Sequence, residues 1–198
     1  MATITPRRLT LKDGSTGLIR SLREDEAAAL RDLVRDIARD SEFIATAQDE
    51  ANPDEAFWHK RITDWNAAPR NLLIVAERDG QLVGDLGLRG GERRKLHHHA
   101  DLGMGFIKSA RGLGLGRAIL QAGLDWAAAH AEIEKVHLGV FPENTPALTL
   151  YRAIGFREEG RQVSFFKQPD GSRRDNIVMG VFVKPALAPA GSGVYMPR

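Results

Sequence analysis

The stretch from Asp101 to Ala131, DLGMGFIKSARGLGLGRAILQAGLDWAAAHA, constrains the fold more than any other part of the chain. Residues 102–107 form a short apolar run that favours a buried strand. From about Gly114 onward, apolar residues recur at the spacing of one helix face. These residues are Leu115, Ala118, Ile119, Ala122, Trp126 and Ala129. The sequence therefore predicts a strand, a tight turn and a helix that packs on a core.

Between this strand and this helix lies a turn with glycines at positions 112, 114 and 116. Without side chains, the backbone N–H groups of the turn can approach a ligand closely. A helix N-terminus carries partial positive charge, and bare N–H groups there bind phosphate oxygens well. The pattern indicates an anion site, and a pyrophosphate fits it. On this motif alone, a glycine-rich turn without any ligand stays an alternative.

Two familiar phosphate motifs fit the turn poorly. A Walker-type loop needs Gly, four residues and then Gly-Lys-Ser/Thr, and the sequence contains no such run. A dinucleotide fingerprint that began at Gly112 would need glycine at Arg117, and one that began at Gly114 would need it at Ile119.

The turn resembles the Arg/Gln-x-x-Gly-x-Gly/Ala signature of the GNAT superfamily of acyl-CoA-dependent N-acyltransferases, with Arg111, Gly114 and Gly116 at its fixed positions. The segment HLGVFPENTPALTLYRAIGF (residues 137–156) resembles the second signature of the family. Its matching positions are Asn144, Leu150, Tyr151, Gly155 and Phe156. The two motifs follow in the family's order, and the resemblance covers roughly residues 16–184.

The order of predicted elements is strand, two helices, three strands, helix, strand, helix, two strands. Strands are expected at residues 17–22, 71–77, 81–88, 102–107, 137–141, 157–167 and 176–184, and helices at 24–39, 53–65, 114–131 and 147–154. This is the order of the GNAT fold, an α/β (α+β) fold. It has a mixed sheet, a V-shaped splay between two parallel strands, and helices on both faces. We expect a flexible arm at 1–15, one domain at 16–184 and a flexible tail at 185–198.

The resemblance implies acetyl-CoA as co-substrate. Its pantetheine arm would pair with the backbone of Phe106, Ile107 and Lys108. Its pyrophosphate would lie on N–H groups of the glycine turn, formed by Arg111, Gly112, Leu113, Gly114, Leu115, Gly116 and Arg117. Asn144, with Ala147 in the helix that begins near Pro146, would support the arm. Arg111, Arg117 and Arg152 would favour the phosphates electrostatically.

The chemistry implied is aminolysis of a thioester. Tyr151 would protonate the departing thiolate as general acid; the alternative is a half-buried core tyrosine on the stripe of Leu150 and Ile154. An alkyl ammonium with a pKa of about 10.4 must lose a proton before it attacks. Asp101 is the candidate base, directly or through water. It could instead pair with the basic loop at residues 90–95.

Other chemistries find little support. The chain has no cysteine, which excludes disulfides, thiolate metal sites and a cysteine acyl-enzyme. No Gly-x-Ser-x-Gly elbow occurs either, so we expect direct transfer in a ternary complex. His97, His98 and His99 invite a metal, but only alternate residues of a strand share a face, and no further ligand is spaced for zinc; we expect no metal. The role of these histidines stays open.

A net charge of +2 without a basic arm argues against a nucleic-acid partner. Without a signal peptide or a membrane-length apolar run, a cytoplasmic protein with no membrane partner is the default. The acceptor would be a primary amine: a free amino acid, a small amine or polyamine, or a peptide N-terminus.

The acceptor side is less well defined by the sequence. Between residues 24 and 55, eleven Asp or Glu face three Arg. They form either a negatively charged entrance to the acceptor site, which would attract cationic amines, or solvated helix faces. Trp58 and Trp65 are core residues or walls of an acceptor pocket. The edge strands of the last hairpin would permit a homodimer. Two other functions stay open: a catalytically silent acyl-CoA sensor and a protein that binds ATP or NAD.

Overall fold

The computed structural model describes residues 2–46, 50 and 54–197, and it divides into two compact units. The first unit comprises Met1–Arg89 and Gly103–Gly123, and the second comprises Gly90–Leu102 and Leu124–Arg198. Strand β5 (His99–Phe106) and helix α3 (Leu115–Ala129) each pass from one unit into the other along the chain.

The strands of the first unit follow the order β1-β2-β3-β4-β5, and neighbours from β1 to β4 are antiparallel. Their bounds are β1 (Arg7–Thr10), β2 (Thr16–Ser21), β3 (Leu72–Arg78) and β4 (Gln81–Gly90). Asp79 and Gly80 join β3 to β4, with φ angles of 50° and 82°. Two successive residues with positive φ are what a tight Asp-Gly hairpin turn requires, so the strands expected at residues 71–77 and 81–88 form a hairpin.

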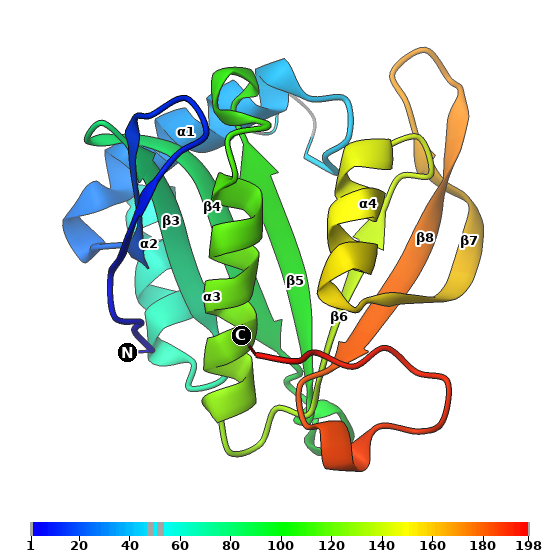
Figure 1. Ribbon diagram of the computed structural model, residues 1–198. Coiled ribbons are helices and arrows are strands. Elements are labelled where there is room, and N and C mark those ends of the chain that lie inside the picture. The colour runs from blue at the N-terminus through cyan, green and yellow to red at the C-terminus, as the bar shows by residue number, and fades with distance from the viewer. Residues whose placement is uncertain (1, 47–49, 51–53, 198) are drawn as a thin grey trace. The chain divides into compact units, whose positions relative to one another are not determined.

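Helices cover both faces of β4 in the first unit. A Cβ added at Gly87 would meet the Trp65 ring of α2 (Glu55–Ala67), whereas one added at Gly123 of α3 would meet Leu86 and Leu88. Since neighbouring side chains of a strand point to opposite faces, α2 and α3 lie on opposite sides of β4. In Figure 1, α3 lies in front of this strand, and α2 lies behind it with α1 (Ala27–Asp40).

Helix α2 begins at Glu55, two residues after its expected start. The Asp54 side chain accepts a hydrogen bond from the Phe57 N–H at 2.8 Å, which satisfies one of the free amides of the first turn. Residue 53, where the helix was expected to begin, lies outside the described residues. The helix packs its buried face with α1 on β3. The shared core consists of Leu22, Ala27, Leu30, Leu33, Ile37, Trp58, Ile62, Leu73 and Val75.

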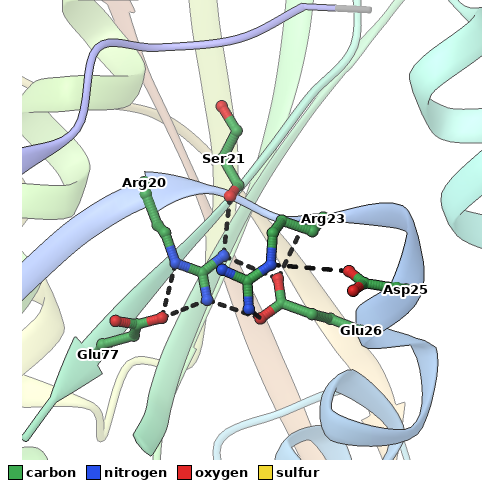
Figure 2. A network of polar contacts seen from close by, with 6 residues as sticks. All are labelled: Arg20, Ser21, Arg23, Asp25, Glu26 and Glu77. Carbon is green, nitrogen blue, oxygen red and sulfur yellow. Dashed lines mark hydrogen bonds and ion pairs between the residues drawn. The ribbon is translucent and has the colours of Figure 1, made fainter. Parts of the chain in front are cut away.

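A buried ionic network ties β2 to β3 and to the short 3-10 helix η1 (Glu24–Glu26) (Figure 2). Arg20 is only 8% exposed. Its guanidinium donates to both carboxylate oxygens of Glu26, at 2.6 and 2.7 Å, and to Glu77 through Nε at 2.6 Å. Burial would raise the pKa of Glu26, but hydrogen bonds from Arg20 and from the Arg23 N–H outweigh it and hold that pKa below its usual range.

Loss of the Glu26 charge should therefore destabilise the protein. We expect Glu26→Gln to lower the free energy of unfolding at pH 7 by about 2 kcal/mol, because Arg20 keeps its charge but loses a bidentate partner. The folded-state pKa of Glu26 is depressed, so this contribution is present above about pH 4.5 and vanishes as the pH falls below that. Urea unfolding checks it, with exposed Glu24→Gln as the control; equal stability of the two variants would contradict the account.

The second unit joins parallel and antiparallel strands in the order β5-β6-β8-β7. The strands added here are β6 (Lys135–Val140), β7 (Arg157–Lys167) and β8 (Arg173–Phe182). Strands β5 and β6 run parallel, paired from His99↔Lys135 to Asp101↔His137, whereas the β6–β8 and β7–β8 pairs are antiparallel. Helix α4 (Thr145–Ile154) ends at Gly155, whose φ of 116° makes it the predicted glycine C-cap. The mixed α/β fold is confirmed.

Two segments that were expected to be flexible make specific contacts with the rest of the chain. Strand β1 pairs with β2 inside the expected N-terminal arm. In the expected tail, Val194 bridges to Phe182, and Tyr195 is 2% exposed with its hydroxyl donating to Asp125 at 2.7 Å. Neither segment carries a periodic apolar pattern. The sequence therefore contains no sign that residues 7–10 pair with β2 or that the Tyr195 side chain is buried.

The buried face of α3 also differs from the predicted stripe. It consists of Leu115, Ile119, Leu120, Ala122, Leu124 and Ala127. Trp126 is only half-buried, and Ala129 is exposed. The buried residues of α3 therefore extend around more of the helix circumference than a single apolar stripe would.

No helix in the described part of the chain is long and apolar enough to cross a membrane.

Candidate functional site

The glycine turn of the first unit leaves backbone amides accessible at the start of α3. Gly112 and Gly114 have φ angles of 79° and 101°, a conformation that favours glycine, and a Cβ at either position would meet nothing within 4 Å. The first helical hydrogen bond runs from the Ala118 N–H to the Gly114 carbonyl at 3.2 Å. The four N–H groups from Gly114 to Arg117 precede that ladder, as at any helix start. This arrangement can bind an anion.

The Arg111 side chain holds the turn in place. Its guanidinium donates to the Phe106 carbonyl at 2.9 and 3.1 Å, and to the Asp40 carbonyl at 3.2 Å. The guanidinium thus links the end of β5 to the end of α1. These contacts position the turn, and a contribution of Arg111 to the binding of the coenzyme phosphates stays a prediction.

The backbone expected to carry pantetheine already makes hydrogen bonds. The Lys108 N–H donates to the Asp40 carboxylate at 3.0 Å, and the Ile107 N–H donates to the Val83 carbonyl at 3.1 Å. The bond from Lys108 also holds the pKa of Asp40 below its usual range. A ligand that pairs with the Phe106 carbonyl or the Lys108 amide would therefore replace or share a contact of Arg111 or Asp40.

The second unit carries Asn144, Ala147 and Tyr151 on α4. The Asn144 side chain accepts from the Ala147 N–H at 3.3 Å, so it caps the helix that presents Tyr151. Tyr151 is 6% exposed and packs on Phe156, with ring centroids 5.6 Å apart. In the part of the chain that is described, its hydroxyl has no hydrogen-bond partner. Burial raises the pKa of Tyr151 to about 12, so the phenol keeps its proton at neutral pH.

Asp101 lies beside a histidine. The two residues face each other in the β5–β6 ladder, and the His137 Nε2 lies 3.6 Å from the Asp101 carboxylate. The Asp101 side chain is 62% exposed, whereas the Nδ1 atom of His137 is buried without a hydrogen-bond partner among the described residues. An exposed carboxylate next to an imidazole can relay protons.

The three consecutive histidines do not form a metal site. His97 contacts the Glu92 carbonyl at 3.3 Å and lies 3.9 Å from Glu132, while the His98 and His99 rings pack edge to face with their centroids 4.0 Å apart. Burial, followed by the neighbouring histidines, lowers the pKa of His99. Among residues 2–46, 50 and 54–197, no group of three or more His, Cys, Asp or Glu side chains could hold a metal ion.

The acidic residues of α1 are largely paired within their own helix. Asp32 contacts Arg31 and Arg35 at 3.1 and 3.2 Å, and Asp36 contacts Arg39 at 2.9 Å. These pairs lie on the surface and offset one another's charge. The pairing favours the interpretation that these acidic residues lie on solvated helix faces, rather than at a negatively charged entrance to the acceptor site.

Sequence reasoning missed Asp85. This residue lies in the middle of β4 between Gly84 and Leu86, which are both buried, and it points to the face that α2 covers. Burial raises the pKa of Asp85 to about 6, and nearby Arg61 only partly opposes that shift. A Cβ at Gly105 of β5 would lie 3.5 Å from its Oδ1 atom. One acidic residue in an apolar strand, with glycine close by, was the available signal.

Asp85 should reduce stability at neutral pH. The raised pKa means that the folded protein holds this proton more tightly than the unfolded chain, so stability falls as pH rises from about 4 to about 6 and is then constant. We expect Asp85→Asn to raise the free energy of unfolding at pH 7 by about 2 kcal/mol, with no gain below about pH 4. Of the charged groups near it, Arg61 of α2 attracts it and Arg89 lies along its own strand.

Urea unfolding of Asp85→Asn and wild type at pH 4 and pH 7 measures this difference. Asp79→Asn, in the exposed β3–β4 turn, is the matched control and should change stability little at either pH. A gain of equal size at both pH values would contradict the titration argument.

Sequence and structure comparisons converge on one family. A sequence model of the acetyltransferase (GNAT) family matches residues 30–156. The L-amino acid N-acetyltransferase AaaT of Escherichia coli (strain K12) is 26% identical over 127 residues, which cover 64% of this chain and 76% of that protein. Another relative is 34% identical over 131 residues, and the chain spans only 39% of its length.

Two solved structures show the same fold. The GNAT-family acetyltransferase from Streptococcus pneumoniae has a TM-score of 0.80 at 23% identity, covering 84% of this chain and 99% of that one. The yncA structure from Salmonella typhimurium, solved with its cofactor acetyl-CoA, has a TM-score of 0.74 at 17% identity, covering 88% of this chain and 98% of that one.

Proposed function

Because this chain belongs to the acetyltransferase (GNAT) family, we propose that it transfers the acetyl group of acetyl-CoA to a primary amine, directly and within a ternary complex. The acceptor is a free amino acid, a small amine or a peptide N-terminus. The observation that carries the proposal is the glycine turn at Gly112 and Gly114, where amides at the start of α3 are open to a pyrophosphate. The yncA structure from Salmonella typhimurium, solved with its cofactor acetyl-CoA, supports the same co-substrate.

In the proposed reaction, the amine nitrogen attacks the thioester carbonyl carbon and forms a C–N bond. Its proton passes to Asp101, directly or by way of water and His137. The C–S bond then breaks, and Tyr151 gives its hydroxyl proton to the departing sulfur. The tyrosine regains a proton from Asp101 through solvent, so N-acetylated amine and free coenzyme A leave. The protonated, buried phenol and the 3.6 Å Asp101–His137 contact support these roles.

Coenzyme release with a panel of amines tests the reaction, and thermal shifts with acetyl-CoA, ATP and NAD test the ligand. A ligand that binds the native state raises its stability by mass action. We expect stabilisation by acetyl-CoA alone and turnover with at least one amine. Binding without turnover would indicate a sensor, whereas stabilisation by ATP or NAD instead would indicate a nucleotide-binding protein.

A further inference from the structure

One face of β4 and one face of α2 bring together five residues in the first unit that we name the Asp85 cluster: Trp58, Arg61, Trp65, Asp85 and Arg89. Positions 85, 87 and 89 share one face of the strand. Gly87 leaves room there for the Trp65 ring, which a Cβ would meet at 3.0 Å. Positions 58, 61, 62 and 65 share one face of the helix. The residues of the cluster therefore lie on the face of β4 and the face of α2 that these spacings define.

Each arginine of the cluster lies over a tryptophan. The Arg61 guanidinium is 5.1 Å from the Trp58 ring centroid, and the Arg89 guanidinium is 5.2 Å from that of Trp65. Such stacking holds a cation in place without neutralising it. Both arginine residues are exposed, while Asp85 is half-buried. The cluster therefore presents two fixed positive charges beside a recessed negative one.

The charged side chains of Arg61, Arg89 and Asp85 interact electrostatically but form no ion pair among the described residues. Partial desolvation of its guanidinium lowers the pKa of Arg61, as does Arg89, whereas Asp85 raises it. The Asp85 carboxylate accepts a hydrogen bond from its own backbone N–H. A recessed carboxylate is normally paired, so the arrangement indicates a partner from outside the chain. The buried indole N–H groups of Trp58 and Trp65 also have no acceptor in the described structure, although buried indoles usually find one.

We propose that the Asp85 cluster binds the acceptor and that the acceptor is a free amino acid. Asp85 contacts its ammonium group, Arg61 and Arg89 bind its carboxylate, and the half-buried Trp65 ring borders its carbon skeleton. This inference rests on the proposed acetyl transfer. Asp85 lies beside Gly105, which directly precedes Phe106, where we propose that the pantetheine arm binds. A zwitterion satisfies both signs of charge in the cluster at once.

The other amine classes fit the cluster less well. A polyamine would bring a second cation to two guanidiniums, and like charges that meet at a binding surface cost affinity. A peptide N-terminus has an amide carbonyl where a free amino acid has its carboxylate. Guanidinium groups select planar carboxylates through paired, charge-assisted hydrogen bonds.

The test compares each amino acid with its own carboxamide, which keeps the ammonium and the side chain but lacks the carboxylate. We expect wild-type kcat/KM to favour the free acid by roughly 10- to 100-fold, the range for hydrogen bonds to a charged group. Arg61→Met and Arg89→Met should reduce this ratio toward one, and Arg61→Lys should restore part of it. Lys60→Met, at a neighbouring exposed position paired with Asp64, should keep the wild-type ratio.

Direct titration separates this inference from the proposed reaction. Amino acids and their amides are titrated into wild type, Asp85→Asn and Arg61→Met, with thermal melts to verify that each variant is folded. We expect wild type to bind the free acid and both variants to lose at least tenfold in affinity. Binding without coenzyme release would retain the cluster and reject the acetyl transfer. Turnover of polyamines or peptides, with equal kcat/KM for the free amino acid and its carboxamide, would reject the role of the Asp85 cluster and retain the proposed acetyl transfer.

Discussion

A Tyr151→Phe variant is expected to lose roughly 10²-fold or more of its turnover while its affinity for acetyl-CoA stays close to wild type. The substitution removes one hydroxyl group and keeps the ring that packs on Phe156. Without a proton donor near sulfur, the tetrahedral intermediate must expel an unprotonated thiolate. Steady-state kinetics with the best amine, beside calorimetric titration of acetyl-CoA, separates the loss in kcat from any loss in binding.

The chain contains one other tyrosine, which supplies a matched control. Tyr195 is also buried, and its hydroxyl donates to Asp125 at 2.7 Å. Tyr195→Phe therefore removes an equivalent group and a hydrogen bond, at a position to which we assign no catalytic role. We expect it to lower stability slightly and to leave turnover near wild type. If Tyr151→Phe also turns over at the wild-type rate, the general-acid role of Tyr151 is wrong.

A Gly114→Glu variant is expected to weaken coenzyme binding by at least about 10²-fold. A Cβ at this position meets nothing within 4 Å, so the new side chain occupies the space above the amides. Its carboxylate would then lie beside two linked phosphates, and such like-charge contacts cost several kcal/mol. Calorimetric titration of coenzyme A into the variant measures the change in Kd.

Two controls separate charge from backbone strain. Gly171 lies in the β7–β8 turn with a φ of 84° and open space around it, so Gly171→Glu imposes comparable strain away from the proposed phosphate site. We expect that variant to bind coenzyme A normally. Gly114→Gln adds the same bulk without the charge and should have an intermediate effect. Unchanged affinity of Gly114→Glu for coenzyme A would indicate that the pyrophosphate does not bind at this turn.

Local sequence signals predicted most of the elements of the fold. The Asp79-Gly80 turn and the Gly155 end of α4 each use a backbone geometry that few residue types provide. The order of elements, together with the two motifs, was sufficient for the mixed sheet with its parallel β5–β6 pair. Segments without periodicity were less predictable, such as β1 and the end of the chain at Tyr195, because single long-range contacts hold them.

The candidate site was predictable in its backbone and less so in its side chains. Positive φ at Gly112 and Gly114 follows from glycine in the turn. By contrast, a family motif does not reveal which partners a side chain finds. Arg111 contacts two carbonyl oxygens, one of them at Asp40, which is distant in sequence. The same limit applies to Asp85, whose environment depends on where α2 places Arg61.

The most direct test of the account is a crystal structure of the protein with coenzyme A bound. We expect the pyrophosphate oxygens to accept hydrogen bonds from backbone amides between Gly112 and Arg117, with the sulfur within reach of the Tyr151 hydroxyl. A coenzyme bound elsewhere, with those amides facing solvent, would contradict it.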